Sequence, residues 1–269
     1  MNNTSVLKIS CVQMEVGFCD PVANYEKAKE FISKAAEKRA DVVVLPETWN
    51  TGFFPRENLE SYCDKNGEKT KQTIGQLAKE YGINIVAGSV ANVKNGRAYN
   101  TAYIFDRKGE IVGEYDKTHL FSPMDEHKFF TKGDKICKFT LDGKICGIII
   151  CYDIRFPELT RSMALDGLDC LFVVAQWPNV RVSHLKTLVK ARAVENQTFV
   201  VCCNAVGNAD GTVFGGNSRI VDPWGNELSE ANESEEIISA ECDFSVIENI
   251  RNSINVFADR RDDLYNKNI

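Results

Sequence analysis

The feature that most constrains the fold is a series of short apolar runs, separated by segments with helical periodicity. The runs "VVVLP" at residues 42–46, "CGIII" at residues 146–150 and "CLFVVA" at residues 170–175 contain no charged residue. A strand that is apolar on both faces is typical of a sheet that is covered on both sides. Because helical and strand patterns alternate along the chain, the sequence predicts an α/β fold with sheets covered by helices.

Helices are predicted where apolar residues recur every three or four positions. Asp20 and Pro21 precede one such pattern, and Gly82 ends a second one. Three further helices are predicted at 157–166, at about 181–197 and from near Phe244. Strands are predicted at 6–14, 41–47, 83–90, 144–151, 169–175, 198–206 and 235–243, with a strand and turn at 218–228 and a hairpin at 98–117. No Pro-, Gly- or Ser-rich linker interrupts the chain, so we expect one domain over residues 1–269.

Composition narrows the class of protein. The formal net charge is -6, the pI is about 5.3 and the basic residues are dispersed, which argues against a nucleic-acid partner. Lys8 interrupts the short apolar run at the N-terminus, and no segment is long enough to span a bilayer. Ten cysteines occur without any CxxC pair, so we expect small buried hydrophobic side chains in a reducing cytoplasm and no metal site.

Three reactive residues stand where predicted strands end. Glu47 follows "VVVLP", Lys117 follows "GEYD" and Cys151 follows "GIII". Ligands of α/β proteins collect at the carboxyl ends of strands. A carboxylate, an ammonium group and a thiol are sufficient for acyl transfer, although any one of them could be structural. Pro157 predicts a helix start just after the thiol, so we expect Cys151 to be partly exposed, with a lowered pKa.

A hydrolase with a cysteine–histidine pair is the obvious competitor. The chain contains three histidines, at positions 119, 127 and 184. His119 lies two residues after Lys117 and would point the same way if the strand continues. The sequence alone therefore leaves a Cys–His mechanism open beside the Glu–Lys–Cys mechanism.

The blocks "VVVLPETW", "EYDKTHLF" and "GIIICYDIRFPEL" resemble the three signature motifs of the nitrilase-like carbon–nitrogen hydrolases. Further blocks, "KARAVENQTFVVCCNAVG", "GGNSRIVDPWGNEL" and "RRDDLY", extend the resemblance over nearly the whole chain. The resemblance implies an αββα sandwich that stacks into homodimers, with the tail from about residue 250 at the dimer interface. Relatives often have "IPVF" where this chain has "INVF", so Asn255 leaves the path of the tail open.

The resemblance also implies roles for individual residues, with no cofactor. Glu47 would be the general base, Lys117 the stabiliser of the oxyanion and Cys151 the nucleophile. The backbone N–H of Tyr152 would be a second oxyanion donor. A further glutamate follows the lysine block in the family; Glu126 matches it best, with Asp125 as a rival.

Within the family, the blocks "PETWNTGFFP", "KTHLFSPMDEHKFF" and "VVAQWPNVRVSHLKTLVKARAVENQ" look most like the ω-amidase branch, which acts on 2-oxoglutaramate and 2-oxosuccinamate. Such substrates carry a distant carboxylate, for which Arg181 is the candidate partner, with Trp177 as an apolar wall. Arg155 is the rival cation, although an internal pair with Glu158 or Asp153 is its expected role. Nitrilase and N-carbamoyl-amino-acid hydrolase are the alternative activities, and a non-catalytic partner-binding protein is the alternative class.

Overall fold

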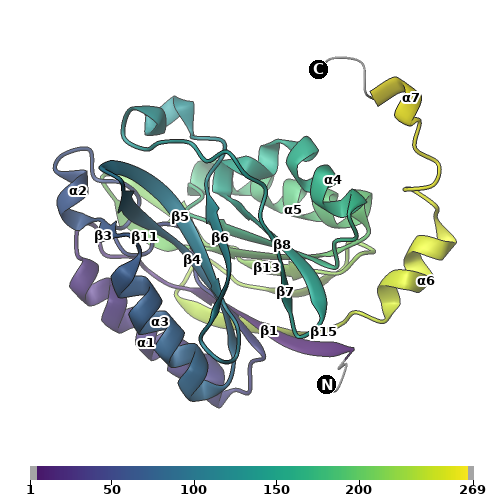
Figure 1. Cartoon of the computed structure of the whole chain (residues 1–269), viewed down its shortest axis with the longest axis horizontal. Coiled ribbons are helices and arrows are strands. Elements are labelled where there is room, and N and C mark those ends of the chain that lie inside the picture. Colours follow the sequence, from purple (N-terminus) through teal and green to yellow (C-terminus); the bar gives the residue numbers. More distant parts are fainter. Residues whose placement is uncertain (1–4, 266–269) are drawn as a thin grey trace.

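The computed structural model describes residues 5–265 and contains two large sheets that face each other (Figure 1). Each sheet has parallel strands at its centre and antiparallel strands toward its edges. The first sheet has the order β15-β1-β2-β4-β5-β6, with β3 beside β4, and contains β1 Val6–Gln13, β2 Val42–Val44, β3 Asp64–Lys65, β4 Asn84–Lys94, β5 Arg97–Phe105, β6 Ile111–Asp116 and β15 Glu236–Asp243.

The second sheet has the order β14-β13-β10-β9-β8-β7. Its strands are β7 Lys138–Leu141, β8 Lys144–Ile150, β9 Cys170–Ala175, β10 Phe199–Asn204, β13 Arg219–Val221 and β14 Glu227–Glu230. A separate hairpin pairs β11 Val206–Ala209 with β12 Thr212–Gly215.

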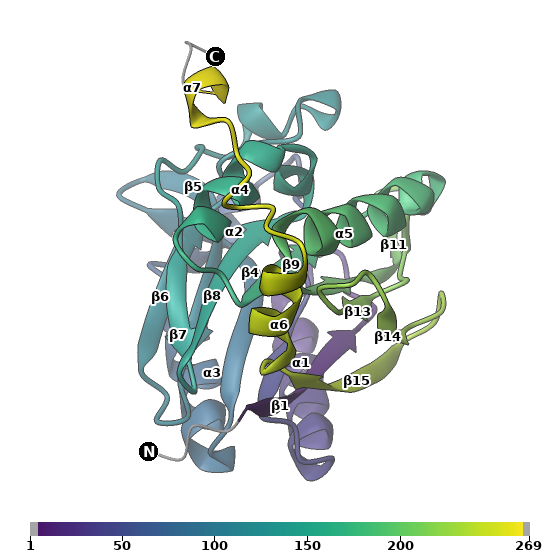
Figure 2. The same ribbon diagram turned by 90° about the vertical axis from the view of Figure 1, so that its right-hand side faces the viewer.

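Two helices cover the outer face of each sheet (Figures 1 and 2). Helices α1 Pro21–Glu37 and α3 Glu68–Tyr81 lie on the first sheet, and α4 Pro157–Leu165 and α5 Val182–Asn196 lie on the second. The Asp20 carboxylate caps α1 by accepting from the Ala23 N–H, and Gly82 ends α3 in the left-handed conformation. The αββα arrangement predicted from the sequence is therefore confirmed.

The apolar strands are buried on both faces, as their sequences predict. Val42 and Val44 belong to the core cluster that also contains Ile148 of the second sheet, whereas Val43 packs in the cluster of Phe31 under the helices. Successive residues of β2 thus point to opposite faces of the sheet, alternately toward the second sheet and toward the covering helices. Eight of the ten cysteines are buried and all ten have free thiols, which agrees with their expected role as small core residues.

Some boundaries and elements differ from the sequence predictions. Strand β2 ends at Val44, before Pro46 and Glu47, and helix α6 Val246–Ser253 begins two residues after Phe244. Several short elements were not predicted, and they comprise α2 Leu59–Tyr62, β3, β7, β11, β12, β14 and the 3₁₀ turns Ser122–Met124, Glu126–Lys128, Cys151–Arg155 and Asn179–Arg181. These elements have few residues, so periodicity does not reveal them.

The C-terminal part leaves the sandwich along one edge. Helix α6 packs Ile247 and Ile250 against the core, and α7 Asp262–Tyr265 projects beyond it (Figures 1 and 2). Ile254, Leu264 and Tyr265 are exposed on this segment. Its predicted role in a dimer interface stays a prediction. Within residues 5–265, no helix combines the length and the apolar character that a membrane span requires.

Candidate active site

The thiol of Cys151 lies at a strained turn directly after β8. The residue has a φ of 47°, in the left-handed region that side chains with a Cβ rarely adopt, and it opens the 3₁₀ turn Cys151–Arg155. Helix α4 follows at Pro157. Strand, sharp turn and helix in this order are the arrangement that presents a nucleophile in hydrolases of other folds.

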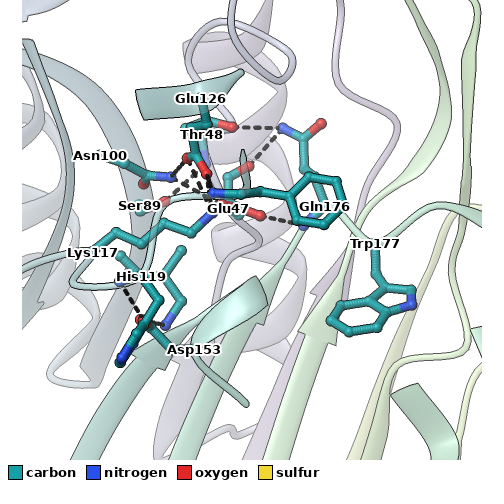
Figure 3. A network of polar contacts seen from close by, with 12 residues as sticks. Glu47, Thr48, Ser89, Asn100, Lys117, His119, Glu126, Asp153, Gln176 and Trp177 are labelled. Atoms are coloured by element: carbon teal, nitrogen blue, oxygen red, sulfur yellow. Dashed lines mark hydrogen bonds and ion pairs between the residues drawn. The ribbon is translucent and has the colours of Figure 1, made fainter. Parts of the chain in front are cut away.

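Two carboxylates and one ammonium group form a buried cluster beside this turn (Figure 3). Lys117 Nζ lies 2.8 Å from Glu47 Oε1 and 3.0 Å from both carboxylate oxygens of Glu126. All three side chains are at most 2% exposed. With both carboxylates ionised the cluster carries one net negative charge. The rival acid Asp125 instead pairs with Lys128 on the surface.

The electrostatics of the cluster keep Lys117 charged. Burial by itself disfavours the ammonium form, but the nearby carboxylates of Glu126 and Glu47 outweigh it and raise the pKa of Lys117 well above its usual value. Burial raises the pKa of Glu126, an effect that Lys117 opposes and Glu47 reinforces. Lys117 is therefore a permanent cation in this site.

The expectation of a partly exposed Cys151 with a lowered pKa is wrong. The residue is 8% exposed. Burial and the Glu47 carboxylate raise the pKa of its thiol well above the usual value, and the opposing charge of Lys117 does not compensate. The thiol therefore keeps its proton at neutral pH, and a base must remove that proton when the sulfur attacks.

Two residues that the sequence analysis did not single out hold Glu47 in place. The Asn100 side-chain amide donates to Glu47 Oε1 at 2.9 Å, and the Gln176 backbone N–H donates to Oε2 at 2.8 Å. The Gln176 side chain also donates to the Glu47 carbonyl oxygen, at 2.6 Å. Gln176 directly follows strand β9, and this position at a strand end was the one signal that could have identified it.

None of the three histidines hydrogen-bonds Cys151 within the described part of the chain. The His119 ring stacks on Phe156 at 3.7 Å and contacts Asp153 through Nδ1 at 2.8 Å. His127 is exposed in the turn Glu126–Lys128, and His184 contacts Arg155. The geometry therefore favours the Glu–Lys–Cys set over a Cys–His pair.

A pocket opens onto Cys151 and Lys117. It encloses about 340 Å³, including its opening to solvent. Its lining contains the predicted residues Tyr152, Trp177 and Arg181, and Arg155 as well. Other lining residues were not predicted, namely Phe53, Phe121, Met124, Gln176 and Pro178. Glu47 and Glu126 are not in the lining, but both form ion pairs with Lys117, which is.

Both arginines of the pocket lie over aromatic rings. The Arg155 guanidinium is 4.7 Å from the Trp177 ring centre, and the Arg181 guanidinium is 5.3 Å from that of Phe121. Neither forms an ion pair among residues 5–265, so the expected internal pair of Arg155 with Glu158 or Asp153 is absent from the described chain. Besides Lys117, two cations thus line the pocket, and neither has a carboxylate of residues 5–265 as an ion-pair partner.

The same part of the chain contains no group of three or more His, Cys, Asp or Glu side chains arranged to hold a metal ion.

Comparison with known proteins agrees with this geometry. The profile of the carbon-nitrogen hydrolase family matches residues 8–252. The chain is 46% identical to a 2-oxoglutaramate amidase of Bacillus subtilis (96% of this chain, 98% of the relative) and 36% identical to a nitrilase of Pyrococcus abyssi (97% and 99%). A carbon-nitrogen hydrolase structure from Helicobacter pylori superimposes with a TM-score of 0.91 at 25% identity, covering 98% of both chains. The protein therefore belongs to the carbon–nitrogen hydrolase family.

Proposed function

We propose that this protein is an ω-amidase, which hydrolyses the terminal amide of small dicarboxylic monoamides such as 2-oxoglutaramate and 2-oxosuccinamate. The observation that carries the proposal is one pocket that contains a buried thiol, a buried ammonium group and two guanidinium groups, neither of which pairs with a carboxylate in the described part of the chain. The similarity to the amidase of Bacillus subtilis supports the same substrate class.

The reaction begins at Cys151. Its sulfur attacks the amide carbonyl carbon while Glu47 takes the thiol proton, because the raised pKa of the thiol makes a base necessary. The negative charge on the carbonyl oxygen is stabilised by the Lys117 ammonium group and by the Tyr152 backbone N–H. Donors of this kind typically contribute about 10²–10³ in rate each.

The tetrahedral intermediate then breaks its C–N bond. Glu47 returns the proton to the nitrogen, ammonia leaves and a thioester remains on Cys151. Water, deprotonated by Glu47, adds to the thioester carbonyl, the C–S bond breaks, and the carboxylic acid leaves as the thiol regains its proton. Glu126 holds the Lys117 ammonium group through both carboxylate oxygens and so orients it.

The substrate carries a carboxylate at the end away from the amide, and we propose that the enzyme recognises the substrate by this charge. Arg181 opens α5 at the pocket, and its backbone carbonyl accepts from the Trp177 indole N–H at 2.7 Å. We assign Arg181 to the substrate carboxylate and Trp177 to the apolar chain. Arg155, which lines the same pocket, is the second cation within it.

Arg181→Ala tests this assignment. Loss of a charge-assisted hydrogen bond costs about 1.5–3 kcal/mol, so kcat/KM for 2-oxoglutaramate should fall roughly 10- to 100-fold. Propionamide, which has no carboxylate, should lose little. Lys108→Ala, which removes an exposed cation in the hairpin turn after β5, is the matched control. Equal losses for both substrates would indicate that Arg181 has a structural role. No loss for either would indicate that Arg155 binds the substrate carboxylate instead.

Nitrile hydrolysis is the second candidate, favoured by the similarity to the nitrilase of Pyrococcus abyssi. Ammonia release from matched ω-amides, nitriles and carbamoyl amino acids separates these activities. Faster turnover of the nitriles would reject the ω-amidase proposal. No release from any of them, together with an unreactive Cys151, would favour a non-catalytic binding protein.

We further propose that the protein acts in the cytoplasm as a homodimer. Ten free cysteines suit a reducing compartment. The exposed Leu264 and Tyr265 on the projecting α7 are candidates for burial against a second copy. Sedimentation of the full chain should give a dimer that a Leu264→Asp/Tyr265→Asp variant weakens, and a monomeric wild-type protein would reject the dimer.

A further inference from the structure

The Asp153 carboxylate is buried and has five hydrogen-bond partners. Its Oδ2 accepts from the Ile150 N–H at 2.9 Å and the Tyr115 hydroxyl at 2.8 Å. Its Oδ1 lies 2.9 Å from the His119 backbone nitrogen, 2.8 Å from His119 Nδ1 and 3.1 Å from the Thr118 hydroxyl (Figure 3). Asp153 is fully buried and is not in the lining of the pocket.

The partners come from two separate segments. Ile150 precedes Cys151 at the end of the second sheet, whereas Thr118 and His119 directly follow Lys117 at the end of the first. One carboxylate therefore ties the turn that carries the thiol to the loop that carries the ammonium group. One oxygen accepts from the backbone N–H of Ile150 and the other from that of His119, so the carboxylate connects the backbones of the two segments.

We propose that Asp153 is a positioning residue that sets the placement of the Lys117 ammonium group relative to the Cys151 thiol. The proposal rests on the proposed amide hydrolysis, in which both groups act on one carbonyl. Such placement matters because a shift of about 1 Å in reacting groups can cost about 10²-fold in rate.

A second contact fixes the same turn from another direction. The buried Arg192 of α5 donates to the Ile154 carbonyl oxygen through Nε at 3.1 Å and Nη2 at 2.7 Å. The turn Cys151–Arg155, which starts with a left-handed Cys151, is thus held by the helix layer as well as by Asp153. Of these two supports, the Asp153 carboxylate is the one that also reaches the Lys117 loop.

Asparagine cannot replace the Asp153 carboxylate in this role. Its amide nitrogen would face either the Ile150 N–H or the His119 N–H, and in each orientation two donors meet. Asp153→Asn therefore releases one of the two segments while keeping the size of the side chain. Trp177 and Arg181, which are assigned to the substrate, are not partners of Asp153, so the loss should fall on the chemical step.

The matched control is Asp64→Asn. Asp64 is a buried aspartate away from the pocket. Like Asp153, it accepts from a tyrosine hydroxyl (Tyr25), a threonine hydroxyl (Thr70) and two backbone N–H groups (Lys69 and Thr70). Both substitutions should lower the midpoint of thermal unfolding. Asp153→Asn alone should lower kcat for an ω-amide by about 10- to 100-fold while KM stays within about threefold. Equal kcat losses in the two variants would overturn the proposal.

A second readout is independent of the amide substrate. The rate at which iodoacetamide alkylates Cys151 should fall in Asp153→Asn and stay unchanged in Asp64→Asn, even if the natural substrate is not an ω-amide. An unchanged alkylation rate in Asp153→Asn would overturn the proposal. If Asp153→Asn does not fold, the double variant Tyr115→Phe/Thr118→Val replaces it. That variant should show a smaller kcat loss in the same direction, and wild-type kcat would overturn the proposal.

Discussion

Replacing Glu47 by glutamine keeps the size of the proposed base and removes its proton-accepting capacity. Three donors converge on the carboxylate, with the Lys117 ammonium and the Asn100 amide on Oε1 and the Gln176 N–H on Oε2. Glutamine keeps the most bonds if its oxygen stays at the Oε1 position. Its amide nitrogen then faces the Gln176 N–H, and the lost buried bond costs about 1–3 kcal/mol.

The variant should still fold, because Lys117 keeps Glu126 as a partner on both carboxylate oxygens. A cost of this size corresponds to several degrees in the midpoint of thermal unfolding, at about 2–4 °C per kcal/mol for a chain of roughly this length. Turnover should fall much further, by about 10²–10⁴-fold, because the proton has no acceptor.

The thiol supplies a second, less obvious readout. The Glu47 carboxylate contributes to the raised pKa of Cys151, and Lys117 opposes it. Without the carboxylate, Lys117 remains and the pKa of Cys151 should fall. Glu47→Gln should therefore hold more thiolate at neutral pH than the wild type, and yet turn over far less substrate.

The assay combines kcat for an ω-amide with a pH titration of thiolate absorbance, using Cys151→Ala as the blank. Glu114→Gln, which removes a carboxylate from Lys94 outside the pocket, is the control and should keep wild-type turnover. A Glu47→Gln enzyme with kcat within tenfold of the wild type would refute the role of Glu47 as base. A thiolate titration that moves to higher pH would refute the electrostatic reasoning.

The remaining predictions concern the nucleophile, the second carboxylate and the core cysteines. Among the eight buried cysteines, Cys151 should be alkylated first at neutral pH, because its thiol lines the pocket and Glu47 can take its proton. Activity should be lost in parallel, and labelling elsewhere accompanied by inactivation would contradict this. Glu126→Gln should lower kcat less than Glu47→Gln does, which the same amide assay measures. Burial raises the pKa values of Cys202 and Cys242 to about 12, so above about pH 9 the unfolded chain loses thiol protons that the folded chain retains. The free energy of unfolding should then fall with rising pH, by up to about 1.4 kcal/mol per pH unit for each such cysteine, and Cys202→Ala/Cys242→Ala should flatten the decline in urea titrations.

Much of the fold follows from patterns that span a few residues. The apolar runs before Glu47 and Cys151, the cap at Asp20 and the glycine that ends α3 are local signals, and each predicted element exists. The same local patterns also predicted that Glu47, Lys117 and Cys151 stand at the ends of strands. The structure brings all three together, although β2 itself stops before Pro46.

What the sequence could not supply depends on contacts between distant segments. Asn100 and Asp153 are ordinary polar residues in the sequence, and their roles arise from partners more than thirty positions away. The pKa of Cys151 was mispredicted for the same reason. A strand end beside a helix start suggests a stabilised thiolate, but the folded chain adds burial and the Glu47 anion.

The reactive groups are divided between the two sheets. Glu47 and Lys117 follow strands of the first sheet, and Cys151 follows a strand of the second. The site is thus an interface within one chain, and neither half contains both a nucleophile and the base that activates it. A half-made or loosely docked chain would hold an inert thiol, so reactivity would appear only when the two sheets close on their common core.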